Sequence, residues 1–246
     1  MKGTAFDIET IPNMDMVGQI ASVQDRMVGV KAPANYKDPQ KIDEYVASKR
    51  REASDKREVE IQKMNLNPFT GRICAAAFVG GDWQDSVHMA KVDDDDERQV
   101  IQDITKTLNL LFKDDLPLVT FNGIYFDLPY LYKRCIILDL PVPDLRIPAL
   151  TKRYSYYPHF DIRMALTDWD RHGAGSLDYF AKAILGESKE EPEYSKFISL
   201  IEAGKGAEIA DSCLQHTRLT RKLFERMQRF YLDDSETHIK NGRFPY

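Results

Sequence analysis

The strongest constraint on this chain is a pair of acids, Asp7 and Glu9, at the end of a short apolar run. Residues 3–8 have the character of a β-strand, and alternation along a strand places both acids on one face, about 7 Å apart along the chain. Neighbouring carboxylates repel each other unless a cation lies between them. The pair is therefore either a solvated surface feature or part of a site for Mg²⁺ or Mn²⁺, which prefer oxygen ligands.

A second acidic motif follows a buried apolar run at residues 117–121. The dipeptide Asn122-Gly123 signals a turn, and a helix is expected over about 126–137 with Asp127 in its first turn. An acid at that place can stabilise the helix N-terminus by about 0.3–1 kcal/mol. Alternatively, Asp127 is a third carboxylate that another element brings to Asp7 and Glu9.

Together these segments resemble the DEDD superfamily of 3′–5′ exonucleases, in the group related to the proofreading domain of family-B DNA polymerases. The first motif of that group reads Phe-Asp-Ile-Glu-Thr, as at residues 6–10. The second reads Asn-Gly-x-x-Phe-Asp-x-Pro-Tyr-Leu, as at residues 122–131. Residues 31–71 also resemble an insert of a phage and prokaryotic branch. Two such motifs in this order are a specific signal.

The resemblance implies an enzyme that removes nucleotides from 3′ ends of single-stranded nucleic acid, DNA rather than RNA. Hydrolysis would use two divalent ions, Mg²⁺ or Mn²⁺. Asp7 would bridge the ions, Glu9 would bind one of them, and Asp127 would support the second. Nucleic-acid contacts are implied for four residues: Thr10, Ile11, Asn122 and Phe126. A replication or recombination protein is a candidate partner, and a cytoplasmic location is expected.

The third motif departs from the family pattern Tyr-Cys-x-x-Asp-x-x-x-Thr. In the matching stretch Cys213 fits, but Ser212 stands at the Tyr position and His216 at the position of the fourth metal-ligating Asp. The histidine-type variant of the motif has His five residues before Asp. Here the order is reversed, because Asp211 comes five residues before His216.

The exchange of Asp for His leaves three interpretations of the role of His216. Imidazole binds Mn²⁺ or Zn²⁺ better than Mg²⁺, so His216 as a ligand would favour Mn²⁺. Its pH range also suits a general base. In the third interpretation the site has lost its catalytic activity and His216 only packs against its neighbours. The phenol missing from the motif could come from one of four tyrosines near the expected site loops: Tyr125, Tyr154, Tyr156 and Tyr157.

Two functions therefore compete. The first is an active metal-dependent 3′–5′ exonuclease with His216 as a fourth site residue, and the second is a nucleic-acid-binding or scaffold protein that kept the fold and lost the chemistry. Three of the four acids remain, which favours the enzyme. RNA is an alternative substrate, since nothing in the sequence distinguishes the sugar.

Composition and element order predict one RNase H-like α/β domain over residues 1–246, with a polar, partly helical insert at about 12–66. The chain has 246 residues, 43% of them hydrophobic, a net charge of −5 and no apolar run that approaches a membrane span. Further strands are expected at 72–80 and 83–89, helices at 96–113 and 206–231, and a Pro-rich loop at 140–148.

The expected fold is a mixed sheet with helices on both faces, and it brings the first-strand acids beside the last helix, at one edge of the sheet. Asp161, in a segment similar to a His-x-Asp-Leu stretch of the family, is expected to be structural. The three cysteines form no zinc or disulfide pattern and are interpreted as buried and reduced.

Overall fold

The computed structural model describes residues 3–19, 30–80, 86–89, 97–188 and 197–232. The chain divides into two compact units, residues 1–9 with 73–246 and residues 10–72. The insert expected at about 12–66 falls within the second unit. That the whole chain acts as one domain remains a prediction.

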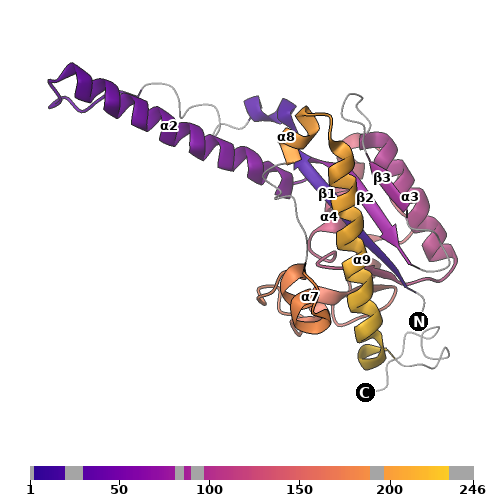
Figure 1. Ribbon diagram of the computed structural model, residues 1–246. Helices are drawn as coiled ribbons and strands as arrows, with labels where there is room; N and C mark the ends of the chain where they lie inside the picture. Colours follow the sequence, from indigo (N-terminus) through magenta and orange to yellow (C-terminus); the bar gives the residue numbers. More distant parts are fainter. Residues whose placement is uncertain (1–2, 20–29, 81–85, 90–96, 189–196, 233–246) are drawn as a thin grey trace. The chain divides into compact units, whose positions relative to one another are not determined.

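The first unit is built on a five-stranded sheet in the order β3-β2-β1-β4-β5 (Figure 1). Strand β1 is parallel to β4, β4 is parallel to β5, and β2 is antiparallel to β3. The predicted mixed sheet of RNase H-like type is therefore confirmed. The strand bounds are β1 Thr4–Pro12, β2 Gly71–Val79, β3 Ser86–Met89, β4 Leu118–Thr120 and β5 His159–Asp161. Residues 81–85 and 90–96, which include parts of an expected strand and helix, lie outside the described residues.

Helices of the first unit follow the predicted order. The last helix, α9, has the predicted bounds, Gly206–Tyr231. The Pro-rich segment expected to be loop is partly helical, because α5 begins at Ile147 with a proline in its first turn, where a missing N–H costs nothing. The other helices are α3 Glu97–Lys113, α4 Asp127–Leu138, α6 Ile162–Leu166, α7 Leu177–Leu185 and α8 Phe197–Glu202.

Alternation along β1 separates two apolar layers. Phe6 and Ile8 pack into the core that includes residues of α3 and α4, and the Phe6 ring stacks on Phe78 with centroids 4.8 Å apart. Ala5 packs on the other side with residues of α9 such as Phe224. In Figure 1, α9 crosses in front of the strands. By the same alternation, Asp7 and Glu9 lie on the α9 side of the sheet.

A buried ion pair ties α3 to α4. The Glu97 carboxylate accepts hydrogen bonds from Arg134 Nε at 2.8 Å and Nη2 at 2.6 Å, and from the backbone N–H of Ile73 at 2.8 Å. Both side chains are about 5% exposed. Glu97 thus joins β2, α3 and α4, and it is also the acidic residue in the first turn of α3.

The second unit contains the long helix α2, Pro39–Lys63, between the 3₁₀ helices η1, Met14–Gln19, and η2, Met64–Leu66. Asp38 caps α2 by accepting a hydrogen bond from Gln40 N, and none of the residues of α2 is buried. On its surface Glu52 pairs with Lys49 and Lys56, which lower the pKa of Glu52 to about 2. None of the helices in the described part of the chain has the length and apolar character to cross a membrane.

Candidate metal centre

The two acids of β1 lie beneath α9, and the backbone around them is held by thiols on both sides. The Asp7 side chain is 21% exposed, whereas that of Glu9 is 4% exposed. Cys213 Sγ on α9 contacts the Asp7 carbonyl oxygen at 3.7 Å, and Cys74 Sγ on β2 contacts that of Glu9 at 3.4 Å. Because β1 is the central strand, the acids lie in the middle of the sheet, and their expected position at its edge is wrong.

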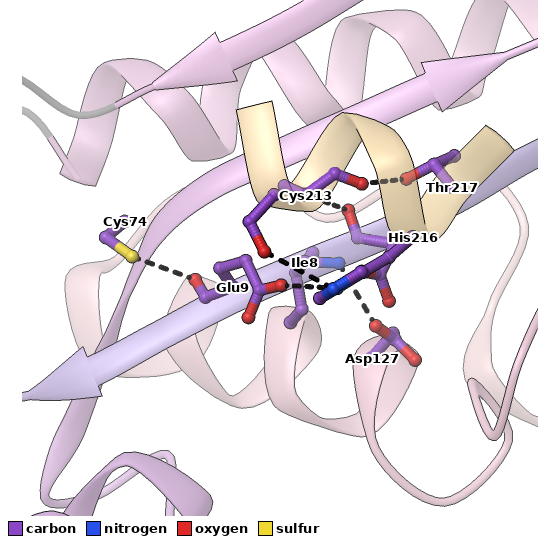
Figure 2. A network of polar contacts seen from close by, with 9 residues as sticks. Ile8, Glu9, Cys74, Asp127, Cys213, His216 and Thr217 are labelled. Atoms are coloured by element: carbon purple, nitrogen blue, oxygen red, sulfur yellow. Dashed lines mark hydrogen bonds and ion pairs between the residues drawn. The ribbon is translucent and has the colours of Figure 1, made fainter. Parts of the chain in front are cut away.

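Asp127 joins β1 from the first turn of α4. Its Oδ1 accepts a hydrogen bond from the backbone N–H of Ile8 at 3.2 Å, and the residue is 2% exposed (Figure 2). Burial and then the nearby charge of Asp7 raise the pKa of the Asp127 carboxyl well above its usual range. A divalent ion next to these groups would favour the ionised carboxylate again. The structure thus brings the second acidic motif to the first.

His216 reaches the same place from α9. Its Nδ1 lies 2.9 Å from Glu9 Oε1 (Figure 2). The same nitrogen lies 3.8 Å from Asp7 Oδ2, and Nε2 lies 3.3 Å from Ser212 Oγ. When Nε2 donates to Ser212, the neutral ring presents a lone pair at Nδ1 to two carboxylates. That arrangement requires a proton or a cation between Nδ1 and the acids.

Cys213 is a member of this cluster that the sequence analysis did not select. One ligand atom each from Asp7, Glu9 and Cys213 lie within 4.8 Å of one another. Burial, followed by the charges of Asp7 and Glu9, raises the pKa of the Cys213 thiol, so the metal-free group is protonated. Its spacing of three residues from His216 on one helix was the available signal.

The turn between β4 and α4 carries the second motif. Asn122 adopts a left-handed conformation with φ of 72°. Gly123 N donates to Thr120 Oγ1 at 3.0 Å, and a Cβ on Gly123 would collide with the Thr120 side chain, so glycine is required here. The ring of Phe126 packs on Tyr130 with centroids 5.4 Å apart. This turn therefore fixes where α4, and with it Asp127, begins.

Asp161 holds this turn from β5, in agreement with its predicted structural role. Its carboxylate accepts hydrogen bonds from the backbone N–H groups of Asn122, Ile124 and Met164, at 3.1, 2.9 and 3.1 Å. Arg163, which the sequence analysis missed, donates to Asn122 Oδ1 at 3.1 Å. The side chain of Asn122 is thus oriented by a neighbouring cation.

His159 supports the same turn as a neutral ring. Its Nδ1 lies 2.7 Å from Leu150 O and its Nε2 lies 2.8 Å from Thr120 Oγ1. These partners fit a proton on Nδ1 and a hydroxyl that donates to Nε2. Burial lowers the pKa of His159 below its usual value, although the nearby Asp161 opposes this.

Other residues selected from the sequence have structural partners. Thr10 and Ile11 are buried, and the Thr10 hydroxyl donates to Asn65 O at 2.9 Å. The nucleic-acid contacts of Thr10, Ile11, Asn122 and Phe126 remain predictions. The four candidate tyrosines make aromatic, cation–π or hydrogen-bond contacts: Tyr125 with Arg171, Tyr154 and Tyr156 with Trp169, and Tyr157 with Asp115.

Comparison with known proteins agrees with this geometry. Residues 65–240 match the family described as a predicted 3′–5′ exonuclease related to the exonuclease domain of PolB. The chain belongs to this family. DNA polymerase 1 of Pyrococcus abyssi is 28% identical over 138 residues, which are 52% of this chain and 18% of that protein, and its strain GE5 counterpart matches equally.

A solved structure supports the fold of this family member. The family B DNA polymerase of Pyrobaculum calidifontis superimposes with a TM-score of 0.57 at 18% identity, over 94% of this chain and 25% of that one. The chain therefore spans about a quarter or less of the length of these polymerases. The likeness to the solved structure concerns the fold.

Proposed function

We propose that this protein is a metal-dependent 3′–5′ exonuclease that acts on single-stranded nucleic acid, DNA in preference to RNA. The observation that carries the proposal is the convergence of Asp7 and Glu9 from β1 with Asp127 from α4, next to His216 on α9. Residues separated by 119 positions meet through the Asp127–Ile8 hydrogen bond. The membership of the family supports the reaction class.

The donor set suits divalent cations. Two such ions would supply a hydroxide near neutral pH and would stabilise charge on the attacking and leaving oxygens. Asp7, the most exposed of the three acids, would bridge two ions, and Glu9 and Asp127 would each support one of them. His216 would either ligate through Nδ1 or accept a proton there, since its Nε2 already faces Ser212.

The decisive variant is Asp7→Ala, which should abolish cleavage because none of the neighbouring acids can replace a bridging carboxylate. The assay follows end-labelled single-stranded DNA and RNA with Mg²⁺, Mn²⁺ or Zn²⁺. Asp211→Ala is the matched control: this acid lies on the same helix as His216 but is exposed. Full activity of Asp7→Ala would place the metal site elsewhere, and an equal loss of activity in Asp211→Ala would show that the effect is not specific to the acids of β1.

The contact of His216 with Glu9 favours a second candidate, a nucleic-acid-binding protein whose site has lost the chemistry. The variant His216→Asp separates the two functions. An active enzyme with a histidine ligand should prefer Mn²⁺, and the variant should shift that preference toward Mg²⁺. A degenerate protein should be inert with every metal and could gain activity in the variant. Equal rates with both metals, unchanged by the substitution, would exclude His216 from the chemistry.

A further inference from the structure

A surface of aromatic rings and cations begins within the second acidic motif. Tyr125, two residues before Asp127, has the Arg171 guanidinium 5.0 Å from its ring centroid. Tyr154 has the Arg153 guanidinium 5.3 Å from its own ring centroid. Both arginines are exposed, and Tyr154 is 64% exposed although it is a large aromatic residue. The two tyrosines and the two arginines form an aromatic patch of two rings and two planar cations.

Trp169 connects the two halves of the aromatic patch. Its side chain belongs to the buried apolar cluster against which Tyr125 packs. The Tyr154 and Trp169 rings have their centroids 5.4 Å apart, and Arg153 Nη2 donates to Trp169 O at 3.3 Å. Tyr125 and Tyr154 therefore share one buried base.

Arg163 ties the segment after Trp169 to the turn that begins α4. Its Nη2 donates to Gly173 O at 2.9 Å, and its Nη1 donates to Asn122 Oδ1 at 3.1 Å. Asn122 lies in the second motif, five residues before Asp127. The aromatic patch is therefore attached to the element that carries the third acid of the candidate metal centre.

The backbone at this patch adopts a conformation that is unusual for its residues. The φ angle is 58° at Tyr154, 51° at Asp168 and 63° at Trp169. Left-handed backbone is rare for bulky residues other than glycine and costs free energy. Such conformations persist where the surrounding structure holds them, and they are concentrated in binding sites. At Tyr154 burial of the ring does not offset the cost, because most of the ring is exposed. This combination points to a ligand for the ring.

The exposed side chains around the aromatic patch carry excess positive charge in a chain whose net charge is −5. Lys152, Arg153 and Arg171 are exposed here, alongside the exposed acids Asp168 and Asp170. Guanidinium groups pair with phosphates and also stack on planar rings. Aromatic side chains stack on bases of any sequence. The patch thus offers both kinds of contact that a single strand of nucleic acid can use.

We propose that the aromatic patch binds single-stranded nucleic acid. One unpaired base stacks on Tyr154, a second stacks on the Arg171 guanidinium over Tyr125, and Arg153 contacts the phosphates. The biological role of this surface rests on the proposed exonuclease function, but the proposal concerns binding and not hydrolysis. In a duplex the faces of the bases are stacked on one another, so the patch selects unpaired strands.

Binding without metal ions tests the proposal separately from cleavage. Fluorescence anisotropy of a labelled oligothymidylate is measured in EDTA, and the same oligomer in a duplex serves for comparison. The wild type should bind the single strand more tightly than the duplex. Tyr154→Ala should weaken single-strand binding about 5- to 150-fold, which corresponds to about 1–3 kcal/mol for one stacked base. Tyr154→Phe keeps the ring and should bind as the wild type does.

Tyr179→Ala is the matched control. Tyr179 is 60% exposed on α7 and packs on Phe180 with ring centroids 5.1 Å apart, so it resembles Tyr154 in exposure and in having an aromatic neighbour. This variant should bind the single strand as tightly as the wild type. Arg153→Gln should reduce the slope of log Kd against log salt concentration by about 0.7, the share of one phosphate contact on a single strand.

Three results would overturn the proposal: a wild type that does not bind the oligomer, equal binding of single strand and duplex, or unchanged binding in Tyr154→Ala. Cleavage assays with Mg²⁺ or Mn²⁺ distinguish this failure from that of the nuclease. An active wild type whose binding survives Tyr154→Ala keeps the nuclease and refutes the patch, whereas an inert wild type whose binding is lost in Tyr154→Ala does the reverse. Should Tyr154→Ala fail to fold, Tyr154→Gly replaces it, because glycine adopts a φ of 58° without strain.

Discussion

Removal of the Asp161 carboxylate should loosen the turn that carries the second acidic motif. Asp161 is 1% exposed, and its Oδ1 accepts from Asn122 N and Met164 N, whereas Oδ2 accepts from Ile124 N. Asp161→Asn can keep an oxygen at the Oδ1 position and so retains two of these three bonds. Asp161→Ala retains none. The two variants should therefore differ in a graded way.

The expected magnitudes follow from the number of N–H groups left without an acceptor. A buried donor without a partner costs about 1–3 kcal/mol. Asp161→Asn leaves one such donor, so its free energy of unfolding should fall by about 1–3 kcal/mol. Asp161→Ala leaves three such donors, so its free energy of unfolding should fall by about 3–9 kcal/mol. The loss should be toward the lower end of this range, because Asn122 is only half-buried and water can partly replace the lost acceptor of its N–H.

Urea unfolding followed by tryptophan fluorescence can measure this. Trp169 belongs to the same apolar cluster as Ile124 and Met164, and a Trp83→Phe background isolates its signal. The exposed Asp114 provides a control, since Asp114→Ala should change stability by no more than about 0.5 kcal/mol. A loss below about 1 kcal/mol in Asp161→Ala, or equal losses in both Asp161 variants, would refute the hydrogen-bond argument.

Three other predictions concern buried charges. The folded pKa of the Asp127 carboxyl is raised, so the protonated carboxyl contributes its full stability below about pH 4, and this stability is lost as pH rises. Asp127→Asn should therefore raise the melting temperature of the metal-free protein at pH 7 but not at pH 3.5. The folded pKa of His159 is lowered, so the neutral ring contributes to stability above about pH 6.5, and this stability is lost as pH falls. The free energy of unfolding should therefore be lower at pH 5 than at pH 7.5, and His159→Asn should reduce this difference. Arg134→Met should destabilise by about 3–5 kcal/mol, since it leaves Glu97 as an unpaired buried charge, and Glu97→Gln in the same chain should recover part of that loss in chemical unfolding.

Short-range patterns were sufficient for much of the fold. Side-chain alternation is a property of every strand, so the sequence could place Asp7 and Glu9 on one face of β1, and the structure has that face on the α9 side. The last helix, which carries the third motif, was predicted at 206–231, and α9 has these bounds. The element order then predicted the mixed sheet, because parallel strands need helical crossovers between them.

Contacts between distant segments decided the rest. The rotation of α9 about its axis determines that His216 reaches Glu9 and that Cys213 joins the acids, and this rotation depends on packing against the sheet. Two of the three N–H groups that meet Asp161 belong to the turn after β4, 39 and 37 positions away in the chain, and no local pattern connects them to β5. The third, that of Met164, is a local cap of α6. The burial of Asp127, which raises the pKa of its carboxyl, likewise depends on contacts with the whole core. The sequence determined which chemical groups are present and on which faces of their elements they lie, whereas the tertiary structure decided their mutual distances, since these depend on how the elements pack together.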